Sequence, residues 1–449
     1  MEKKLTEGSV LRKIVLFSLP YFLSYFLQTL YGMADLFIVG QFDGVASTTA
    51  VSIGSQVMHM LTVVLVGLAM GTTVCIGQAV GANDRERAAR LVGNTATFFV
   101  LLSFVLTGVL VLLVRPIVSV MSTPTEAVEG TVAYLTVCFI GIPFITAYNI
   151  ISAVFRGMGD STHPMLFVGI ACAVNIGLDF LFIGALSMGP MGAALGTTLS
   201  QLVSVIISLI FMKYRGLGLP LTKHCLKPSR EILGQLLRIG VPIALQDGLI
   251  QIAFILITVI ANRRGLNDAA AVGIVEKIIG FVFLVPSSML STVSALGAQN
   301  IGAGEPERAK KTLWYAILIA AGFGFVVSVL TQWIAEPVVA LFTNADTENG
   351  ALVVRMGGQY LRGYIWDCMF AGMHFCFSGY FCAIGRSELS FLHNIIAVAL
   401  VRVPGAYLMS RAFPETLFPM GLATTTGSLV SVFICVIAYS SLCHKRKKV

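Results

Sequence analysis

Long apolar stretches separated by short polar segments restrict the possible folds of this chain more than any other feature. Crossing the hydrocarbon core of a bilayer takes about 20 mostly apolar residues of α-helix. Backbone groups in lipid must be bonded internally, and strand-like alternation is absent, so the sequence predicts an all-α polytopic membrane protein. Only 12% of the residues are charged, against about 25% in soluble domains. We expect twelve transmembrane helices, near residues 14–40, 48–74, 91–114, 130–153, 164–186, 191–213, 234–262, 270–295, 312–334, 357–383, 390–411 and 417–442.

A polar motif that occurs twice indicates that the chain is duplicated. Residues 77–91 read GQAVGANDRERAARL and residues 298–313 read AQNIGAGEPERAKKTL, so Gln78 aligns with Gln299, half a chain further on. Three further pairs of segments repeat at nearly the same spacing: 18–20 with 240–242, 155–160 with 381–386, and 189–194 with 418–423. Repeats of this length indicate homologous halves rather than solenoid units. The sequence predicts two pseudo-symmetric six-helix bundles: an N-terminal lobe (1–212), a basic cytoplasmic linker (213–233) and a C-terminal lobe (234–449).

The basic residues gather on one side of this topology. With both termini and the loops that follow even-numbered helices placed on that side, it holds 22 of the 30 Lys and Arg residues. The positive-inside rule then predicts a multi-pass membrane protein with both termini in the cytoplasm. The net charge of +8 is divided among separate loops, which argues against nucleic acid as a partner.

Signatures of an enzyme or of ATP binding are missing from the sequence. It has no GxxxxGK[ST] phosphate loop, no HExxH and no GxSxG motif, and its nine cysteines form no CxxC pair or zinc-type spacing. We therefore expect neither an enzyme nor a bound cofactor. Buried carboxylates between two related halves are typical of a secondary carrier with alternating access.

Acidic and polar residues within the first lobe are candidates for coupling transport to a cation. Asp35 lies in the apolar run LYGMADLFIVGQF, and Asn175 and Asp179 share one helical face in AVNIGLDFLFI. A carboxylate at membrane depth is costly unless it faces a wet cavity or a partner. An interhelical hydrogen bond with no transport role is the alternative. The polar residues expected to contact a substrate in this lobe are Gln28, Tyr31, Asn149 and Thr198, and Thr197 and Gln201 line the same sector of helix 6.

The second lobe carries a different set of charged residues. Asp367 lies in GYIWDCMFAGMHFCF, and its counterpart in the first half is Gly141, so the halves are not chemically equivalent. Arg402 is a candidate counter-ion for Asp367 or for Glu276, in a pair that is either structural or coupled to a proton. Glu276 could instead lie at the membrane interface. We expect Trp366 and Met369 to join Asp367 in binding substrate, because aromatic faces attract cations and methionine adapts to varied shapes.

Taken together, the motifs resemble the MATE (multidrug and toxic compound extrusion) family of the MOP flippase superfamily. The resemblance covers nearly the whole chain and rests on the duplicated loop, FRGMGDSTHPM, NIGLDFLFI and GPMGAALGTT. It implies a carrier in the bacterial plasma membrane that expels bulky, often cationic and amphipathic compounds in exchange for H⁺ or Na⁺. Asp35 matches the helix 1 aspartate of the family, and Asn175 and Asp179 match its helix 5 pair, both implicated in cation coupling. These three residues would also hold Na⁺ if sodium is the coupling ion.

One departure from the family pattern concerns the second lobe. The NorM-like branch has a glutamate in helix 7, near the positions of Ile250 and Gln251, where this chain has no acid. That branch also has an aspartate in helix 10, and Asp367 lies about one turn before the position expected for it. The chain is therefore more similar to the DinF-like branch. A flippase for lipid-linked precursors, from the same superfamily, is the alternative function, but it would need a cationic cavity for phosphates. A two-lobed cavity needs no partner chain, so we expect a monomer.

Overall fold

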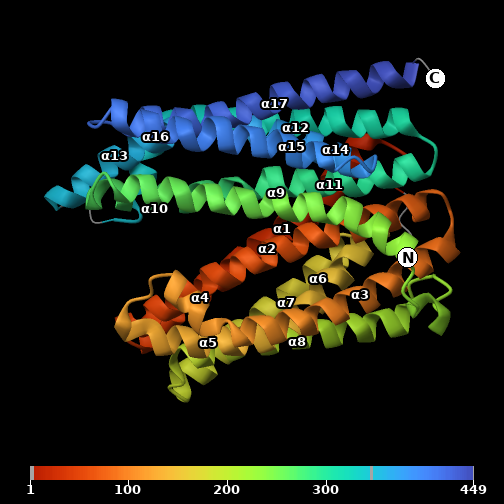
Figure 1. The fold of residues 1–449 in the computed structure, drawn as a ribbon, viewed down its shortest axis with the longest axis horizontal. Helices are drawn as coiled ribbons and strands as arrows, with labels where there is room; N and C mark the ends of the chain where they lie inside the picture. Colours follow the sequence, from red (N-terminus) through yellow and green to blue (C-terminus); the bar gives the residue numbers. More distant parts are fainter. Residues whose placement is uncertain (1–4, 344–346, 448–449) are drawn as a thin grey trace. The chain divides into compact units, whose positions relative to one another are not determined.

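The computed structural model describes residues 5–343 and 347–447, and these residues form helices without a strand. Ten helical segments are long and apolar enough to cross a membrane, and the bent pair α5 and α6 adds an eleventh. The remaining predicted span is formed by α13 and α14, of 17 residues each. The all-α polytopic prediction is confirmed (Figure 1).

Each predicted span corresponds to a single helix or to two or three consecutive helical segments. In the first half they are α1 (Val10–Phe42), α2 (Val45–Gly81), α3 (Arg85–Leu112), α5 (Val128–Ile140) with α6 (Ile142–Gly157), α7 (Thr162–Asp179) with the π-helix η2 (Phe180–Ala185), and α8 (Gly189–Arg215). In the second half they are α9 (Arg230–Asn262), α10 (Leu266–Val282) with α11 (Leu284–Gly302), α12 (Pro306–Ala340), α13 (Glu348–Tyr364) with α14 (Asp367–Ala383), α15 (Glu388–Ala397) with the π-helix η4 (Val398–Arg402) and α16 (Val403–Ala412), and α17 (Phe418–Lys447).

Three spans that the sequence predicts as continuous helices are interrupted. The fourth bends by 49° at Gly141, where Pro143 opens α6. The eighth breaks at Phe283, just before Pro286, and the tenth breaks at Ile365 and Trp366. Proline lacks an N–H and clashes with the preceding turn, which explains the first two breaks. Such interruptions free backbone groups in the middle of a span, where transporters place their sites.

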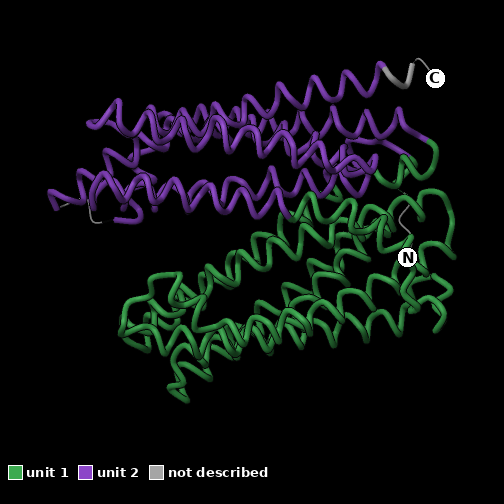
Figure 2. The backbone as a smooth tube through the Cα atoms, viewed as in Figure 1, with its two compact units in different colours: residues 1–7, 16–244, 298–304 green, residues 8–15, 245–297, 305–449 purple. Residues whose placement is uncertain are grey.

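The chain divides into two compact units (Figure 2). Each unit has its own cluster of buried hydrophobic residues. Unit 1 contains residues 16–244, together with the segment that ends at Glu7 and residues 298–304. Unit 2 contains residues 8–15, 245–297 and the chain from Glu305 onward. The lobe boundaries expected from the sequence, 1–212 and 234–449 with the linker 213–233, stay a prediction.

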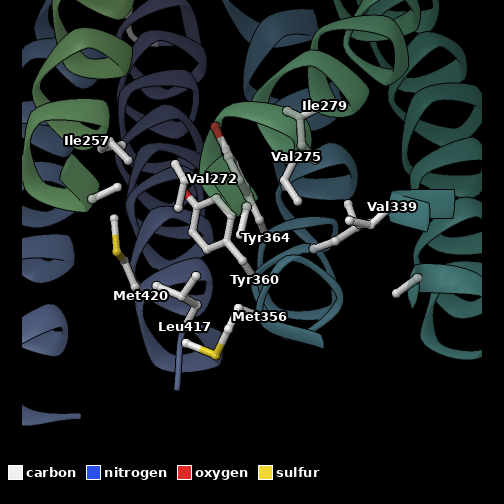
Figure 3. Close-up of a cluster of buried hydrophobic side chains, with 14 of the residues drawn as sticks. Ile257, Val272, Val275, Ile279, Val339, Met356, Tyr360, Tyr364, Leu417 and Met420 are labelled. Atoms are coloured by element: carbon white, nitrogen blue, oxygen red, sulfur yellow. The ribbon is translucent and has the colours of Figure 1, made fainter. Parts of the chain in front are cut away.

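The core of unit 2 is built around two tyrosines of α13. Tyr360 and Tyr364 are fully buried, with their ring centroids 5.5 Å apart. Valines of α10, Leu417 and Met420 pack around the two rings (Figure 3). The corresponding core of unit 1 joins α1, α2, α5 and α8 around Tyr134 and Phe139. These cores hold the helices that carry the charged residues described below.

The duplicated motif forms a reciprocal helix contact within unit 1. A Cβ added to Gly81 would overlap the backbone carbonyl of Gln299, and one added to Gly302 would overlap that of Gln78. The Gln299 side chain also donates a hydrogen bond of 2.9 Å to the carbonyl of Gly157. The glycine of each copy is needed because its helix end lies against the backbone of the other copy.

Candidate functional site

A buried cluster of two carboxylates and one amide lies in unit 1. Asp35 comes from α1, and Asn175 and Asp179 come from successive turns of α7; their exposed fractions are 2%, 0% and 0%. The Asp35 carboxylate lies close enough to Asn175 and Asp179 to interact with both. The spacing of four residues on α7 directs both side chains toward Asp35. The structure thus brings together the three residues that the sequence predicts for cation coupling.

Helix α8 closes one side of this cluster. The Thr197 hydroxyl donates a hydrogen bond of 2.9 Å to Oδ2 of Asp35. The preceding residue, Gly196, leaves space that the Asp179 carboxylate occupies, since an added Cβ would collide with that group. The sequence analysis did not identify Gly196. The LGTT motif that contains it was the available signal, but only a partner from another helix shows why the glycine is needed.

Most polar atoms of the cluster lack a hydrogen-bond partner. Among the described residues, none bonds Oδ1 of Asp35, either carboxylate oxygen of Asp179, or either amide atom of Asn175. Neither Asp35 nor Asp179 forms an ion pair with any residue that the structure describes. Buried polar atoms are nearly always bonded, so several unbonded atoms around two acids call for a further occupant. A proton, Na⁺ or water fits this set of oxygens.

Polar side chains continue from the cluster along α1, α6 and α8. Tyr31 lies one turn before Asp35, with its hydroxyl beside Gln201. Gln28 lies beside Tyr148, whose hydroxyl donates to the carbonyl of Pro164 at 3.2 Å. Gln28 and Tyr31 are thus joined to the acid cluster by neighbouring polar groups. Tyr148 is a further polar neighbour that the sequence analysis did not single out.

The two other predicted polar residues of unit 1 have local contacts. The Asn149 amide donates to the carbonyl of Ile145 at 2.8 Å, one turn earlier in α6. Thr198 packs against Gly141 at the bend between α5 and α6, and its buried hydroxyl has no partner among the described residues. A substrate-binding role for both stays a prediction.

Unit 2 holds its buried acid in an ion pair. Asp367, the first residue of α14, is fully buried and pairs with Arg402, the last residue of η4. The Arg402 guanidinium also lies 5.9 Å from the centroid of the Tyr364 ring, a cation–π contact. Ser428 of α17 lies beside the Asp367 carboxylate. The sequence left Asp367 and Glu276 as alternative partners of Arg402, and the partner in the structure is Asp367.

Glu276 lies apart from this ion pair. Its Oε2 accepts a hydrogen bond of 3.0 Å from the Thr258 hydroxyl of α9, and its Oε1 is buried without a partner among the described residues. It lies near the tyrosines Tyr360 and Tyr364. Glu276 is therefore a half-buried acid inside unit 2, with a bonded side chain.

A small cavity of about 30 Å³ adjoins Arg402. His374, Asn394 and Ser428 contribute polar groups to its wall. The cavity has room for about one water molecule. Within the described chain, Nε of Arg402 and Nδ1 of His374 are buried without a partner, so a water there would satisfy both. This cavity lies beside the ion pair and is too small for an organic substrate.

Trp366 and Met369 have packing contacts inside unit 2. The Trp366 ring packs against Phe325 with centroids 6.2 Å apart, and it borders the core around Tyr364. The backbone of Met369 lies against Gly324 of α12, too close for any side chain there. These contacts fix the start of α14, and substrate binding by the two side chains stays a prediction.

The long apolar helices define a polytopic membrane protein. The MatE family profile matches residues 20–181 and 242–408, which is most of the chain. The chain therefore belongs to the MatE family, whose members are transporters and not enzymes. Both the family and the fold class predicted from the sequence are confirmed.

Relatives of the chain are known in bacteria. It is 27% identical to the probable multidrug resistance protein YoeA of Bacillus subtilis, over 100% of this chain and 97% of the relative. It is 25% identical to the probable multidrug resistance protein NorM of Thermotoga maritima, with 90% and 86% covered. It is 24% identical to the multidrug export protein MepA of Staphylococcus aureus, with 91% and 89% covered.

Solved structures share the fold of this chain over nearly its full length. A crystal structure of MATE in complex with MaL6 superposes with a TM-score of 0.91 at 26% identity, covering 99% of both chains. A MOP superfamily transporter from Pyrococcus furiosus, described by the reverse polarity of its binding pocket, gives 0.93 at 25% identity, with 99% of this chain and 98% of that chain covered. The two-lobe MATE fold is thus the fold of this chain.

Proposed function

We propose that this chain is a secondary antiporter that exports organic cations, drugs or toxic metabolites across the bacterial plasma membrane in exchange for H⁺ or Na⁺. The observation that carries the proposal is the pair of buried acids in unit 1 without a basic partner among the described residues. Relatives named as multidrug resistance and multidrug export proteins support it.

The acid pair provides a site for one exchangeable positive charge. Asp35 and Asp179 belong to different helices, α1 and α7, and two carboxylates in contact repel each other unless a cation lies between them. An entering H⁺ or Na⁺ removes the repulsion, and its release restores it. Occupancy therefore changes the free energy of packing α1 against α7 and α8, which is what alternating access requires. Asn175 supplies a neutral oxygen that binds Na⁺ or accepts a hydrogen bond.

A substrate would contact both polar and aromatic side chains. In unit 1 the candidates are Gln28, Tyr31, Asn149 and Thr198, and in unit 2 they are Trp366, Asp367 and Met369. Aromatic faces and acids favour a cationic, amphipathic compound. We infer a monomer with both termini in the cytoplasm, where the basic loops gather.

The flippase alternative is less favoured by the site. A lipid-linked precursor carries phosphates and needs basic side chains along its path. The unit 1 cluster has two acids and no base bonded to them among the described residues, and the one buried arginine of the unit 2 site already pairs with Asp367. An anionic headgroup would therefore meet repulsion at the cluster.

The test is dye transport in proteoliposomes with a defined gradient of either pH or Na⁺. We expect Asp35→Asn and Asp179→Asn to lower gradient-driven efflux about tenfold or more, because an amide cannot bind and release the coupling cation. Glu129→Gln is the matched control: its side chain is 74% exposed and pairs with Arg115 at 3.0 Å. The gradient that drives efflux identifies the ion. Normal efflux by a well-folded variant with both asparagines would refute the proposal.

A further inference from the structure

A second pocket, remote from the acid sites, opens at the ends of three helices of unit 2. Its volume is about 220 Å³. The pocket lies where α12 begins, α14 ends and α17 approaches its last turn, so it is at the membrane surface on the predicted cytoplasmic side. It is lined by Lys310, Tyr380, Ile384, Arg386, Tyr439, Leu442 and Cys443.

Two basic groups supply the positive charge of the pocket. Lys310 pairs with Glu307 at 2.6 Å, and Arg386 pairs with Glu388. Both acids lie at the surface, with side chains exposed at 74% and 45%, so water screens them strongly. An ammonium has three donors and a guanidinium has five, so each base keeps donors for a further anion.

Two tyrosines, Tyr380 and Tyr439, form an aromatic wall of the pocket, and Trp314 packs beside them. The rings of Tyr380 and Tyr439 lie 5.7 Å apart, and Trp314 meets Tyr439 edge to face at the same centroid distance. Trp314 is 49% exposed. Tryptophan and tyrosine are enriched where a membrane protein passes from the headgroups into the hydrocarbon. The wall therefore has the composition of a membrane interface.

An apolar surface continues from the pocket along the helices. On α12, Trp314 and Leu318 follow Lys310 at steps of four residues, so all three share one face, and Leu318 is 68% exposed. On α17, Val436 is 42% exposed one turn before Tyr439. A free phosphate would use only the basic groups. A phospholipid uses the basic groups, the aromatic wall and the apolar surface at once.

We propose that this pocket binds an anionic phospholipid, with its phosphate at Lys310 and Arg386 and its acyl chains along the Trp314 and Leu318 face of α12. Basic pockets between helices on the cytoplasmic side are suited to anionic headgroups. The bound lipid joins the ends of α12, α14 and α17, and it adds lipid dependence to the stability of unit 2.

Cys443 gives a direct readout of this binding. It lines the pocket and is half-buried, whereas the other eight cysteines are buried. Cys225, in the segment between α8 and α9, competes as a target because a hydrogen bond from the Thr222 hydroxyl lowers the pKa of its thiol. The experiment therefore uses a Cys225→Ser background and measures the rate of maleimide labelling of Cys443 in detergent micelles.

We expect phosphatidylglycerol to slow labelling about tenfold at about ten times its dissociation constant, and phosphatidylcholine to have little effect. Lys310→Gln with Arg386→Gln should remove the protection, whereas Arg115→Gln, an exposed base of unit 1, should keep it. Raising the salt to about 1 M should weaken protection in the unsubstituted pocket, a measurement that does not depend on variant folding.

Three outcomes would overturn the proposal. Equal protection by both lipids would show that the headgroup charge is not recognised. Protection by millimolar inorganic phosphate alone would assign the pocket to a soluble anion. Unchanged labelling with phosphatidylglycerol in the parent protein would show that no lipid binds. The labelling requires no transport, so its result is independent of the antiport test.

Discussion

The buried acids of the two units lie in opposite electrostatic settings. In unit 1, Asp35 and Asp179 lie together with no base bonded to them among the described residues. In unit 2, Asp367 is paired with Arg402. A buried acid with a fixed basic partner has no need of a mobile cation, whereas an acid pair without one does. We therefore propose that cation exchange takes place in unit 1 and that the unit 2 pair is a charge-balanced structural contact.

Aligning the two halves shows that their buried acids lie at different positions of the repeat. Aligning Pro20 with Pro242 places Asp35 on Ile257, which is a fully apolar member of the unit 2 core. The alignment of 155–160 with 381–386, continued toward the N-terminus, places Gly141 on Asp367, and Gly141 is the bend of the fourth span. Each half therefore has a packing or bending residue where the other half has its acid. The two halves thus share the repeated segments but carry their buried acids at different positions.

The largest expected effect concerns the ion pair. Arg402→Gln alone, or Asp367→Asn alone, leaves an uncompensated buried charge and should lower the free energy of unfolding by about 3–5 kcal/mol. The double variant removes both charges and should recover most of the loss, which a double-mutant cycle of thermal unfolding in detergent would measure. Additive losses in the double variant would mean that the two residues do not act as a pair.

Helix positions could be predicted because they depend on local hydrophobicity, and Asn175 and Asp179 could be paired because they lie four residues apart on one helix. Asp35, on a distant helix, could be grouped with them only through the resemblance to the MATE family. The choice between Asp367 and Glu276 as partner of Arg402 could not be predicted, since it depends on contacts between helices far apart in the sequence. The π-helices η2, which follows Asp179, and η4, which ends at Arg402, also have no local signal. Both lie beside site residues, where π-helices are frequent.

A smaller effect is expected at the glycine that packs against each charged group. Gly196 of α8 lies against the Asp179 carboxylate, and a Cβ added to Gly427 of α17 would lie 3.0 Å from the Cβ of Arg402. Gly196→Ala and Gly427→Ala should each cost about 1–3 kcal/mol of stability through overpacking, with the larger loss at Gly196. Thermal unfolding in detergent measures both losses. Gly108→Ala, which meets nothing within 4 Å, is the matched control.

Transport separates these two glycine variants further. Gly196→Ala moves a residue of the proposed cation site, so we expect lower gradient-driven efflux per folded molecule. Gly427→Ala moves only the charge-balanced pair, so efflux should follow the amount of folded protein. Equal losses of specific activity in both variants would remove the functional contrast between the units.

The smallest expected effect is on stability at the unit 1 cluster itself. Asp35→Asn removes a carboxylate that has an acid beside it and no bonded base among the described residues, so the free energy of unfolding should change by less than about 1 kcal/mol or rise. If Na⁺ is the coupling ion, Na⁺ at about ten times its dissociation constant should stabilise the parent protein by about 1.4 kcal/mol. Na⁺ should not change the free energy of unfolding of Asp35→Asn. It should raise that of Asp367→Asn by the same amount as that of the parent protein, because Asp367 does not contribute to the cation site.

Thermal unfolding with choline replacing Na⁺ at constant ionic strength measures this difference. Loss of the Na⁺ effect in Asp367→Asn would show that the two units share one cation site, and the assignment of exchange to unit 1 alone would be wrong.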